Sequence, residues 1–380
     1  MRLKSTLILV SIGLISSLAI STPSFGEEGK SDGKNQNFRQ GENFTSIGIR
    51  SHGVPTRDWT PNSSQPSTMS LNGPSVNQDQ NGSDDSWNSL AFTKNPGTAR
   101  TTFTLGATAR NPISCHTLAC TTLGNQNIVF IPVWVGNWDP ANLSKWDSNF
   151  KKLIDGYSYG ISSPHVFDTN LKYFTLQKPA LNMPTFKWNP NNNLTTLIPS
   201  SNSVSDKDVA TYINTFISKN SGQVLSGTPV YVYIGSSNTR LSSGFGTSYC
   251  GWHTYGKTAT NTQQPYIAIQ DFNPKQYIGC TYQQSSPNGN VALDAMASVL
   301  AHEIDETITD PLLNAWYDAN GSENADKCAW TFGVTQKASN GSVFNFTSNG
   351  TNYLIQQNWL ADNLITSTGL STGTACSVTG

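Results

Sequence analysis

Apolar residues recur every three to four positions between residues 291 and 309, which is the spacing of one face of an α-helix. The residues of this stripe are Leu293, Ala297, Leu300, Ile304 and Ile308. Pro311 disfavours helical geometry at Asp310, so the helix is expected to end near Thr309. One stripe of the helix can therefore be buried while its other positions remain open for chemistry.

Similar patterns predict further elements. Apolar runs predict strands at residues 128–135, 172–176, 229–234 and 266–269. Helical spacing predicts a helix over 143–154 that ends near Gly156, and another over 209–217 with Ser205 as N-cap and Gly222 beyond its end. Pro132 suggests that the first strand lies at a sheet edge or contains a bulge. Asn349-Gly350 predicts a tight hairpin between 343–347 and 351–356.

Together these elements predict one fold class. Strands and helices alternate first, and the C-terminal part is rich in strands. We expect an α/β or α+β fold, in which helices pack on one mixed sheet of a single domain. The helix over 291–309 would be the site helix of this domain.

The N-terminus predicts secretion. A basic start, an apolar run over residues 7–20 and small residues near Gly26 are typical of a signal peptide, which we place at residues 1–26. Residues 27–95 are polar and rich in Gly, Ser, Asn and Pro, and are expected to be a flexible leader. The folded domain is then expected at 96–380. No later stretch is apolar enough for an integral membrane segment, so we expect a secreted, extracellular protein.

Charge and cysteines narrow the function further. A net charge of -1 with 12% charged residues argues against nucleic acid as a partner. Six cysteines in an oxidising compartment suggest three disulfides. Sequence alone does not choose among the 15 connectivities, and we expect neighbours along the chain to pair: Cys115 with Cys120, Cys250 with Cys280 and Cys328 with Cys376.

The segment Ala301-His302-Glu303-Ile304-Asp305-Glu306 has the spacing of metal ligands. His302 and Glu306 are four residues apart, which places both on one helical face about one turn apart. This parallels the H-E-x-x-H helix of zinc hydrolases, with a glutamate in place of the second histidine and Glu303 as general base. The alternative is a surface helix whose charged residues are solvated.

A catalytic zinc normally has three protein ligands, so a third must come from elsewhere. Glu323 and Asp326 lie about twenty residues beyond the helix, and Glu323 is favoured slightly. His253 is another option, as a ligand or as a donor to a developing oxyanion. A divalent metal is the expected cofactor. Zinc is favoured, while the carboxylate-rich ligand set keeps calcium and manganese open.

Four motifs in order resemble the EXORDIUM or phosphate-induced protein 1 family. They are Cys250-Gly251-Trp252-His253, the helix segment 293–303, Asn314-Ala315-Trp316-Tyr317 and the acidic stretch 323–328. The resemblance covers roughly residues 125–360. Asp294-Ala295-Met296 departs from the usual Asp-Gly-Met, and Thr309-Asp310-Pro311 from Ser-Asn-Pro, which makes Asp310 a poor candidate for a shared ligand. The resemblance implies an extracellular protein linked to growth and cell expansion.

Two functions remain open from the sequence. The first is a secreted EXORDIUM-like protein with a divalent-metal, metallopeptidase-like site that hydrolyses peptide bonds. The second is a non-enzymatic extracellular or cell-wall protein of the same family that binds a glycan or a receptor. The expected partners are accordingly an extracellular peptide, a glycan or a receptor.

Overall fold

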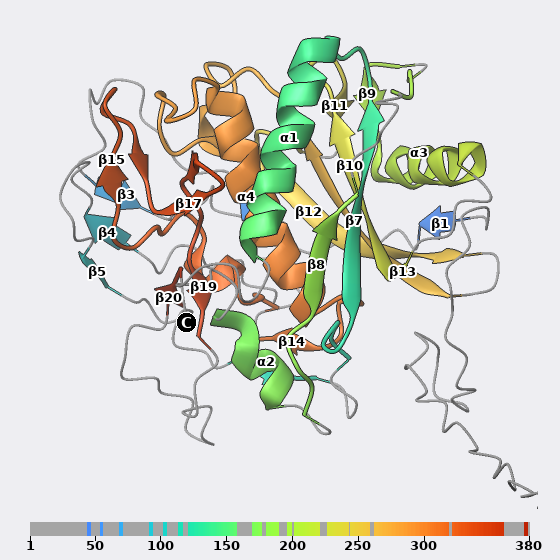
Figure 1. Cartoon of the computed structure of the whole chain (residues 1–380), viewed down its shortest axis with the longest axis horizontal. Coiled ribbons are helices and arrows are strands. Elements are labelled where there is room, and N and C mark those ends of the chain that lie inside the picture. Colours follow the sequence, from blue (N-terminus) through green and yellow to red (C-terminus); the bar gives the residue numbers. More distant parts are fainter. Residues whose placement is uncertain are drawn as a thin grey trace, which may run out of the picture. The chain divides into compact units, whose positions relative to one another are not determined.

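Three apolar segments form the centre of a mixed sheet. They are the strands β7 (Asn127–Val135), β10 (Thr228–Gly235) and β13 (Gln263–Gln270), with β10 parallel to both others. The strand β8 (Thr185–Trp188) extends the sheet beside β7, and β12 (Tyr249–Thr258) pairs antiparallel with β13. The short strand β1 (Phe44–Ser46), labelled in Figure 1, pairs with β12, and β2 (Val54–Pro55) pairs with β12 as well. The predicted mixed sheet of an α+β fold is confirmed.

The computed structural model describes the backbone of residues 44–46, 54–55, 68–70, 91–93 and 102–104. It describes the whole of residues 113–116, 121–157, 169–176, 180–189, 196–199, 201–220, 226–242, 244–258, 262–318, 321–360 and 376–378. All of these lie in one compact unit that begins at Asn37. The division at residues 26 and 95 stays a prediction, because most of residues 1–112 lie outside the described part.

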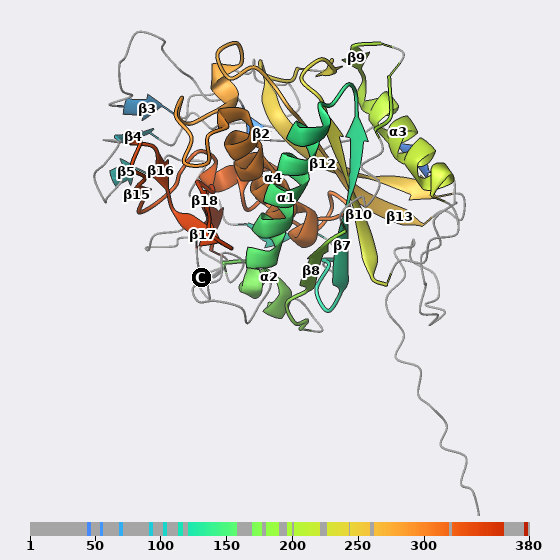
Figure 2. The same ribbon diagram turned by 45° about the horizontal axis from the view of Figure 1, so that its top comes forward.

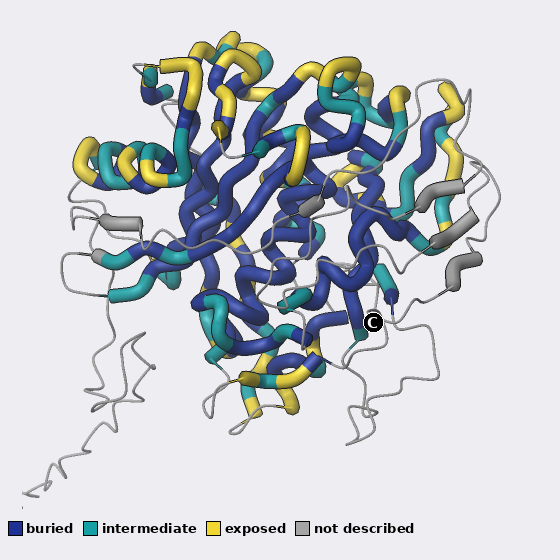
Figure 3. The backbone as a smooth tube through the Cα atoms, turned by 180° about the vertical axis from the view of Figure 1, so that it is seen from behind, coloured by how far each residue is buried: buried dark blue, intermediate teal, exposed yellow. Residues whose placement is uncertain are grey.

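In the described part of the chain, the α-helices that accompany the sheet are α1 (Pro140–Tyr157), α2 (Leu171–Thr175), α3 (Asp206–Lys219) and α4 (Val291–Thr309). The helices α1 and α4 contact each other, α1 beside β8 and α4 over β12 and β13 (Figure 2). The helix α3 packs against β7 and β10, apart from α1 and α4. β7 and β10 are buried along most of their length because helices cover them (Figure 3).

The remaining elements are short. A three-stranded sheet is formed by β3 (Thr68–Ser70), β4 (Ala91–Thr93) and β5 (Thr102–Thr104). Strand pairs are formed by β6 (Ser114–Cys115) and β14 (Trp316–Tyr317), by β9 (Ser203–Val204) and β11 (Arg240–Leu241), by β15 (Gln336–Lys337) and β16 (Val343–Phe344), and by β19 (Asn358–Trp359) and β20 (Cys376–Ser377). Among the described residues, 3₁₀ turns are formed by η4 (Ile278–Cys280) and η5 (Asp326–Cys328). The strand β19 contacts η5, which lies in the acidic stretch 323–328.

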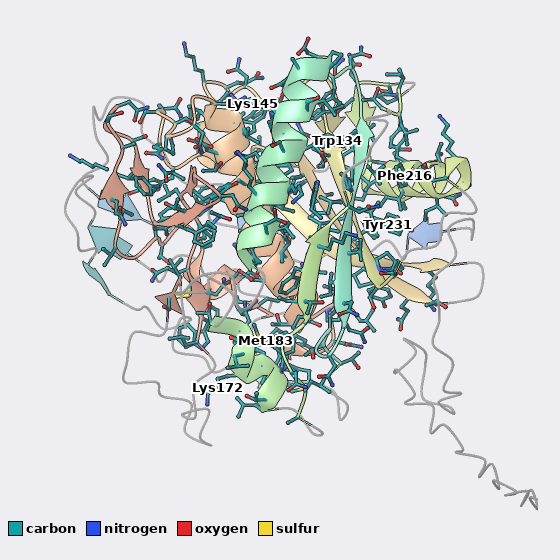
Figure 4. The ribbon with its side chains drawn as sticks, in the orientation of Figure 1. Trp134, Lys145, Lys172, Met183, Phe216 and Tyr231 are labelled. Carbon is teal, nitrogen blue, oxygen red and sulfur yellow. A yellow bond between two sulfur atoms is a disulfide. The ribbon has the colours of Figure 1, made fainter. Side chains whose placement is uncertain are left out.

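Aromatic side chains fill the space between α1 and the sheet. Trp146 of α1 lies against Trp138 and Phe150, and Phe150 in turn contacts Trp188 of β8 with ring centroids 5.7 Å apart. Trp134, labelled in Figure 4, adds a further ring from β7. The predicted helix over 143–154 is confirmed, and its apolar stripe forms this core.

Capping and turn chemistry explain two other predicted elements. The Ser205 hydroxyl accepts a hydrogen bond from the Asp208 N–H, and the Asp208 carboxylate accepts one from the Ser205 N–H, a capping box that starts α3. Gly222 lies outside the described residues. The hairpin is also confirmed: β17 (Phe346–Ser348) pairs with β18 (Thr351–Tyr353), and Asn349 and Gly350 both have positive φ between them.

Two predictions need correction. Residues 172–176 form the helix α2 and not a strand, because Tyr173 and Phe174 are both buried while Leu171 and Leu176 are exposed, which does not follow the alternation of a strand. Pro132 is not at a sheet edge, since β7 lies between β10 and β8. On the β8 side, however, pairing stops at Phe130 and resumes at Leu197, so the missing N–H of Pro132 interrupts no described ladder.

Two of the expected disulfides are present among the described cysteines, Cys250–Cys280 and Cys328–Cys376. Cys115 is disulfide-bonded as well, and its expected partner Cys120 lies outside the described residues. In the part of the chain that the structure covers, every helix is too short or too polar to cross a bilayer.

Asp271, which follows the last residue of β13, makes the free energy of unfolding depend on pH. Burial raises its pKa to about 6, although the Phe272 N–H donates a hydrogen bond to the carboxylate. The raised pKa means that the neutral form stabilises the fold, so this contribution is complete below about pH 4 and is lost as the pH rises to about 6. We expect Asp271→Asn to be more stable than the wild type at pH 7 by about 1–2 kcal/mol, since the side chain is partly exposed.

Urea unfolding at pH 4.5 and pH 7 would measure this difference. As a control, Asp155→Asn makes the same change at a surface carboxylate paired with Lys151 at 2.6 Å, and should not stabilise the protein at pH 7. Equal stability of Asp271→Asn and wild type at both pH values would contradict the prediction.

Candidate functional site

The helix α4 brings three of the predicted residues together. Its N-cap Asn290 accepts a hydrogen bond from the Leu293 N–H at 3.0 Å, which fixes the start of the helix. Two turns from its end, His302 Nε2 lies 3.0 Å from Glu306 Oε1, as the four-residue spacing predicts. His302, Glu303 and Glu306 are all buried, so the alternative of a solvated surface helix is wrong.

His253 reaches the same place from β12, on which α4 packs. Its Nδ1 atom lies 3.4 Å from Glu303 Oε2 and 3.5 Å from Glu306 Oε2. Its Nε2 atom lies 3.3 Å from the backbone oxygen of Asp310, which can only accept a hydrogen bond. His253 is therefore oriented by the turn that follows α4, with Glu323 Oε1 3.5 Å from Nε2.

The acidic loop before Cys328 closes the site. The Asp326 N–H donates to Glu306 Oε1 at 3.0 Å, and the Glu323 N–H donates to Asp326 Oδ2 at 3.2 Å. Asp326 Oδ1 also lies 3.4 Å from His302 Nε2. All six predicted residues, from three separate segments, therefore form one buried cluster. Their roles as base and ligands remain predictions.

Asp310 does not belong to the ligand set. Its carboxylate Oδ1 accepts hydrogen bonds from the N–H groups of Asn314 and Ala315, both at 2.7 Å. This side chain therefore holds the turn after α4 in shape. Its contribution to the cluster is the backbone oxygen that faces His253.

A supporting network behind the cluster was not predicted from the sequence. Asp305 is buried, and its carboxylate accepts hydrogen bonds from Asn170 Nδ2 at 2.9 Å and from Asn358 Nδ2. Asn324 Nδ2 donates to Asn170 Oδ1 at 2.6 Å, which ties the acidic loop to the same network. Burial raises the pKa of Asp305 to about 8. The neighbouring asparagines thus help to fix the loop that carries Glu323 and Asp326.

Several atoms of the cluster lack hydrogen-bond partners. Within the described structure these include His302 Nδ1, Glu306 Oε2 and Glu323 Oε1, and His302 Nε2 lies 3.0 Å from Glu306 Oε1 without hydrogen-bond geometry. Buried polar atoms are usually paired, so unpaired ones that converge point to a missing group. Two triads have ligand atoms within 4.8 Å of one another: His253 with Glu306 and Glu323, and His302 with Glu303 and Glu306. Glu306 belongs to both.

The electrostatics of the cluster show a strong excess of negative charge. Burial alone lowers the pKa of His302, but the negative charges of Glu306 and Asp326 outweigh it and raise the pKa well above its usual range. The pKa of His253 is raised in the same way, chiefly by Glu323. Burial raises the pKa of Glu303 and of Glu323, whereas the charge of His302 lowers that of Glu306.

Formal charges lead to the same conclusion. The cluster contains four carboxylates and two imidazoles, so with every carboxylate ionised it would carry a charge of -2 even if both histidines were protonated. Uncompensated charge is costly in a buried site. The residues present therefore fit a divalent cation, whose preferred ligands include imidazole nitrogen and carboxylate oxygen.

Fold and site together define a mixed α+β domain in which a central helix, a strand and an acidic loop enclose a histidine and carboxylate cluster. Residues 191–363 match the family model described as the phosphate-induced protein 1 conserved region, which includes all six cluster residues. Over these residues the chain is similar to the EXORDIUM and phosphate-induced protein 1 family, as the sequence resemblance indicated.

Two relatives from Arabidopsis thaliana share part of the chain. Protein EXORDIUM-like 3 is 34% identical over 108 residues, which cover 25% of this chain and 32% of the relative. Protein EXORDIUM-like 5 is 31% identical over 87 residues, which cover 19% of this chain and 24% of the relative. The matches thus span about a third and a quarter of the relatives' lengths. No solved structure matches the chain.

Proposed function

We propose that this protein is secreted and holds one divalent metal ion in the buried cluster, where it hydrolyses peptide bonds. The observation that carries the proposal is that two triads of ligand atoms, His253 with Glu306 and Glu323 and His302 with Glu303 and Glu306, share Glu306 in one buried cluster. The disulfides and the family are compatible with an extracellular protein.

The proposed ligands are Glu306, which belongs to both triads, together with His302, His253 and Glu323. Asp326 would orient the ligands, because its N–H donates a hydrogen bond to Glu306 Oε1 and its carboxylate accepts one from the Glu323 N–H. Such partners fix the orientation of metal ligands. Zinc suits the two imidazoles, whereas calcium or manganese would use mainly the carboxylates.

Glu303 is the proposed general base. It follows His302 on the helix and contacts His253. We assign it the role of base, although its carboxylate also lies in the triad with His302 and Glu306. Burial raises its pKa, which makes its carboxylate a better proton acceptor near neutral pH. A bound divalent metal would supply Lewis-acid activation of water and of the substrate carbonyl. Glu303 would take the proton from the attacking water and pass it to the leaving amine.

The degree of burial favours a second function. Of the six cluster residues, Glu323 has the most exposed side chain, at 4%. The side chains of the other five are 0% exposed. Water and a substrate have to reach a catalytic metal, whereas a structural metal can be fully enclosed. A non-enzymatic extracellular protein with a structural metal, which binds a glycan or a receptor in growth or cell expansion, is therefore the second candidate.

Metal analysis of the secreted, full-length protein tests both functions. We expect inductively coupled plasma mass spectrometry to find about one zinc ion per chain. Hydrolysis of a blocked peptide mixture should be lost after treatment with 1,10-phenanthroline and restored by zinc but not by magnesium. Bound metal without hydrolysis would support the second function, and a protein that takes up no divalent metal would overturn both.

A further inference from the structure

Glu306 has a different histidine beside each of its two carboxylate oxygens. Its Oε1 atom lies 3.0 Å from His302 Nε2, and its Oε2 atom lies 3.5 Å from His253 Nδ1. His302 belongs to the same helix, whereas His253 comes from β12. Glu306 therefore divides the cluster into two halves, each with one histidine, that share a single carboxylate.

The half of the cluster around His302 contains one imidazole and two carboxylates. Asp326 Oδ1 lies 3.4 Å from His302 Nε2, in addition to the contact of 3.0 Å with Glu306 Oε1. Ligand atoms of a tetrahedral zinc ion, each about 2.0–2.2 Å from the metal, are about 3.3–3.6 Å apart. The observed spacings are close to this value, so His302, Glu306 and Asp326 can hold one ion with small side-chain movements.

The half around His253 has the same composition. His253, Glu306 and Glu323 have ligand atoms that all lie within 4.8 Å of one another. His253 Nε2 lies 3.3 Å from the backbone oxygen of Asp310, so in the neutral imidazole this nitrogen carries the proton and Nδ1, beside Glu306, carries the lone pair. Metal-binding histidines typically donate their second N–H to an acceptor in this way. His253 is thus oriented as a ligand.

Two buried oxygens in this second half have contacts that are not hydrogen bonds. Glu306 Oε2 and Glu323 Oε1 each lie 3.5 Å from a nitrogen of His253, without hydrogen-bond geometry and without another partner among the described residues. Buried carboxylate oxygens are normally paired. A cation between these oxygens and His253 would satisfy them.

Charge balance favours two ions over one. The cluster contains four carboxylates, from Glu303, Glu306, Glu323 and Asp326, and its two histidines are neutral when they bind metal. With every carboxylate ionised, one divalent ion leaves a net charge of -2 and two divalent ions leave none. Uncompensated charge is costly in a buried site. The second ion would remove the charge that the first leaves.

We propose that the cluster binds a second divalent metal ion, with Glu306 as the bridge between the two. The inference rests on the proposed function, which supplies the first ion. When the second ion binds, the ligands divide: His302, Glu306 and Asp326 keep the first, while His253, Glu306 and Glu323 hold the second. Ions of hydrolytic two-metal sites are about 3.5–4 Å apart, a distance that one bridging carboxylate can span.

The two ions should differ in affinity. The side chains of His302 and Asp326 are fully buried, whereas that of Glu323 retains a small exposed area. The first ion is therefore the tighter one, and the second exchanges with solvent more readily. Glu303 keeps the role of base, because it belongs to the triad of His302 and its Oε2 atom lies 3.4 Å from His253 Nδ1, next to both halves.

Equilibrium dialysis of the secreted, full-length protein against increasing zinc concentrations tests the second ion. We expect about one zinc per chain in the protein as isolated and about two at saturation, counted by inductively coupled plasma mass spectrometry. His116→Ala removes an exposed histidine outside the cluster and should reach the same final count. A count that falls to about one in His116→Ala would place the second ion on the surface and overturn the inference.

Manganese shows whether the two ions are neighbours. Two manganese ions that share a carboxylate couple magnetically, so the saturated protein should give the electron paramagnetic resonance spectrum of a coupled pair. The spectrum of two isolated ions would overturn the bridge through Glu306. This measurement uses the wild-type protein and does not depend on the folding of any variant.

Glu323→Gln tests the ligands of the second ion. It should bind about one zinc at saturation and show no coupled manganese pair, because the amide is a poor ligand and leaves the half around His302 unchanged. Asp155→Asn makes the same kind of change at the surface, beside Lys151, and should still bind about two. Two coupled ions in Glu323→Gln would overturn the assignment of this half.

The outcomes distinguish this inference from the hydrolase proposal. One zinc per chain at saturation, in a protein that hydrolyses peptides, overturns the second ion and leaves the proposed function intact. Two coupled ions in a protein that cleaves no peptide support the second ion and overturn peptide hydrolysis. A protein that takes up no divalent metal overturns both.

Discussion

Replacing His302 by alanine is expected to abolish metal binding. The imidazole lies 3.0 Å from Glu306 Oε1 and 3.4 Å from Asp326 Oδ1, and neither of its nitrogens has another hydrogen-bond partner among the described residues. Loss of a partner behind a ligand already lowers metal affinity about 10–100-fold. Loss of a ligand itself should therefore weaken zinc binding by more than about a hundredfold, measured by competition with a chelating dye.

His116→Ala is the matched control for this experiment. His116 is exposed and stacks on Tyr317 at 3.6 Å, outside the cluster. The His116→Ala protein should bind zinc with the same affinity as the wild type. Thermal unfolding of metal-free His302→Ala would show that the fold survives. Unchanged zinc affinity in a folded His302→Ala protein would exclude the cluster as the metal site.

Glu303→Gln should separate metal binding from chemistry. The amide keeps the size of the side chain but cannot accept the proton of the attacking water. General-base catalysis typically contributes a factor of about 10²–10⁴, so we expect kcat for peptide hydrolysis to fall by this factor while about one zinc per chain is retained.

Asp155→Asn makes the same carboxylate-to-amide change on the surface of α1 and should leave kcat unchanged. A mixture of blocked peptides with zinc in slight excess provides the assay. If Glu303→Gln hydrolyses peptides as fast as the wild type, Glu303 is not the base. If it loses zinc instead, Glu303 belongs to the ligands, as the triad of His302, Glu303 and Glu306 would allow.

The sequence predicted the elements whose patterns are local. The stripe of α4 and the Ser205 cap of α3 depend on residues a few positions apart, and both helices are observed. The strand β12 was missed because its sequence, with Gly251 and Gly256, lacks a regular apolar alternation. It is nevertheless a strand because it pairs with β13 on one side and with β1 and β2 on the other. Such pairing depends on tertiary structure.

For the site as well, residues close together in the sequence could be predicted and distant ones could not. His302, Glu303 and Glu306 could be grouped from their spacing, and Glu323 and Asp326 from a stretch close to them in the chain. The hydrogen bond between Asn170 and Asp305 joins residues 135 positions apart, and no sequence pattern indicates it. The cluster could thus be predicted from one sequence, whereas the network that holds it required the packed fold.

The positions of the two described disulfides bear on how the protein has to be produced. Cys250 precedes His253 by three residues, and Cys328 follows Asp326 by two, so each covalent link anchors a segment that supplies the cluster. Both links tie these segments to parts of the chain 30 and 48 residues away. We therefore expect the proposed metal ion to bind only a chain in which both links have formed. Recombinant material from a reducing cytoplasm would lack the anchors, and a secretory host is the appropriate source.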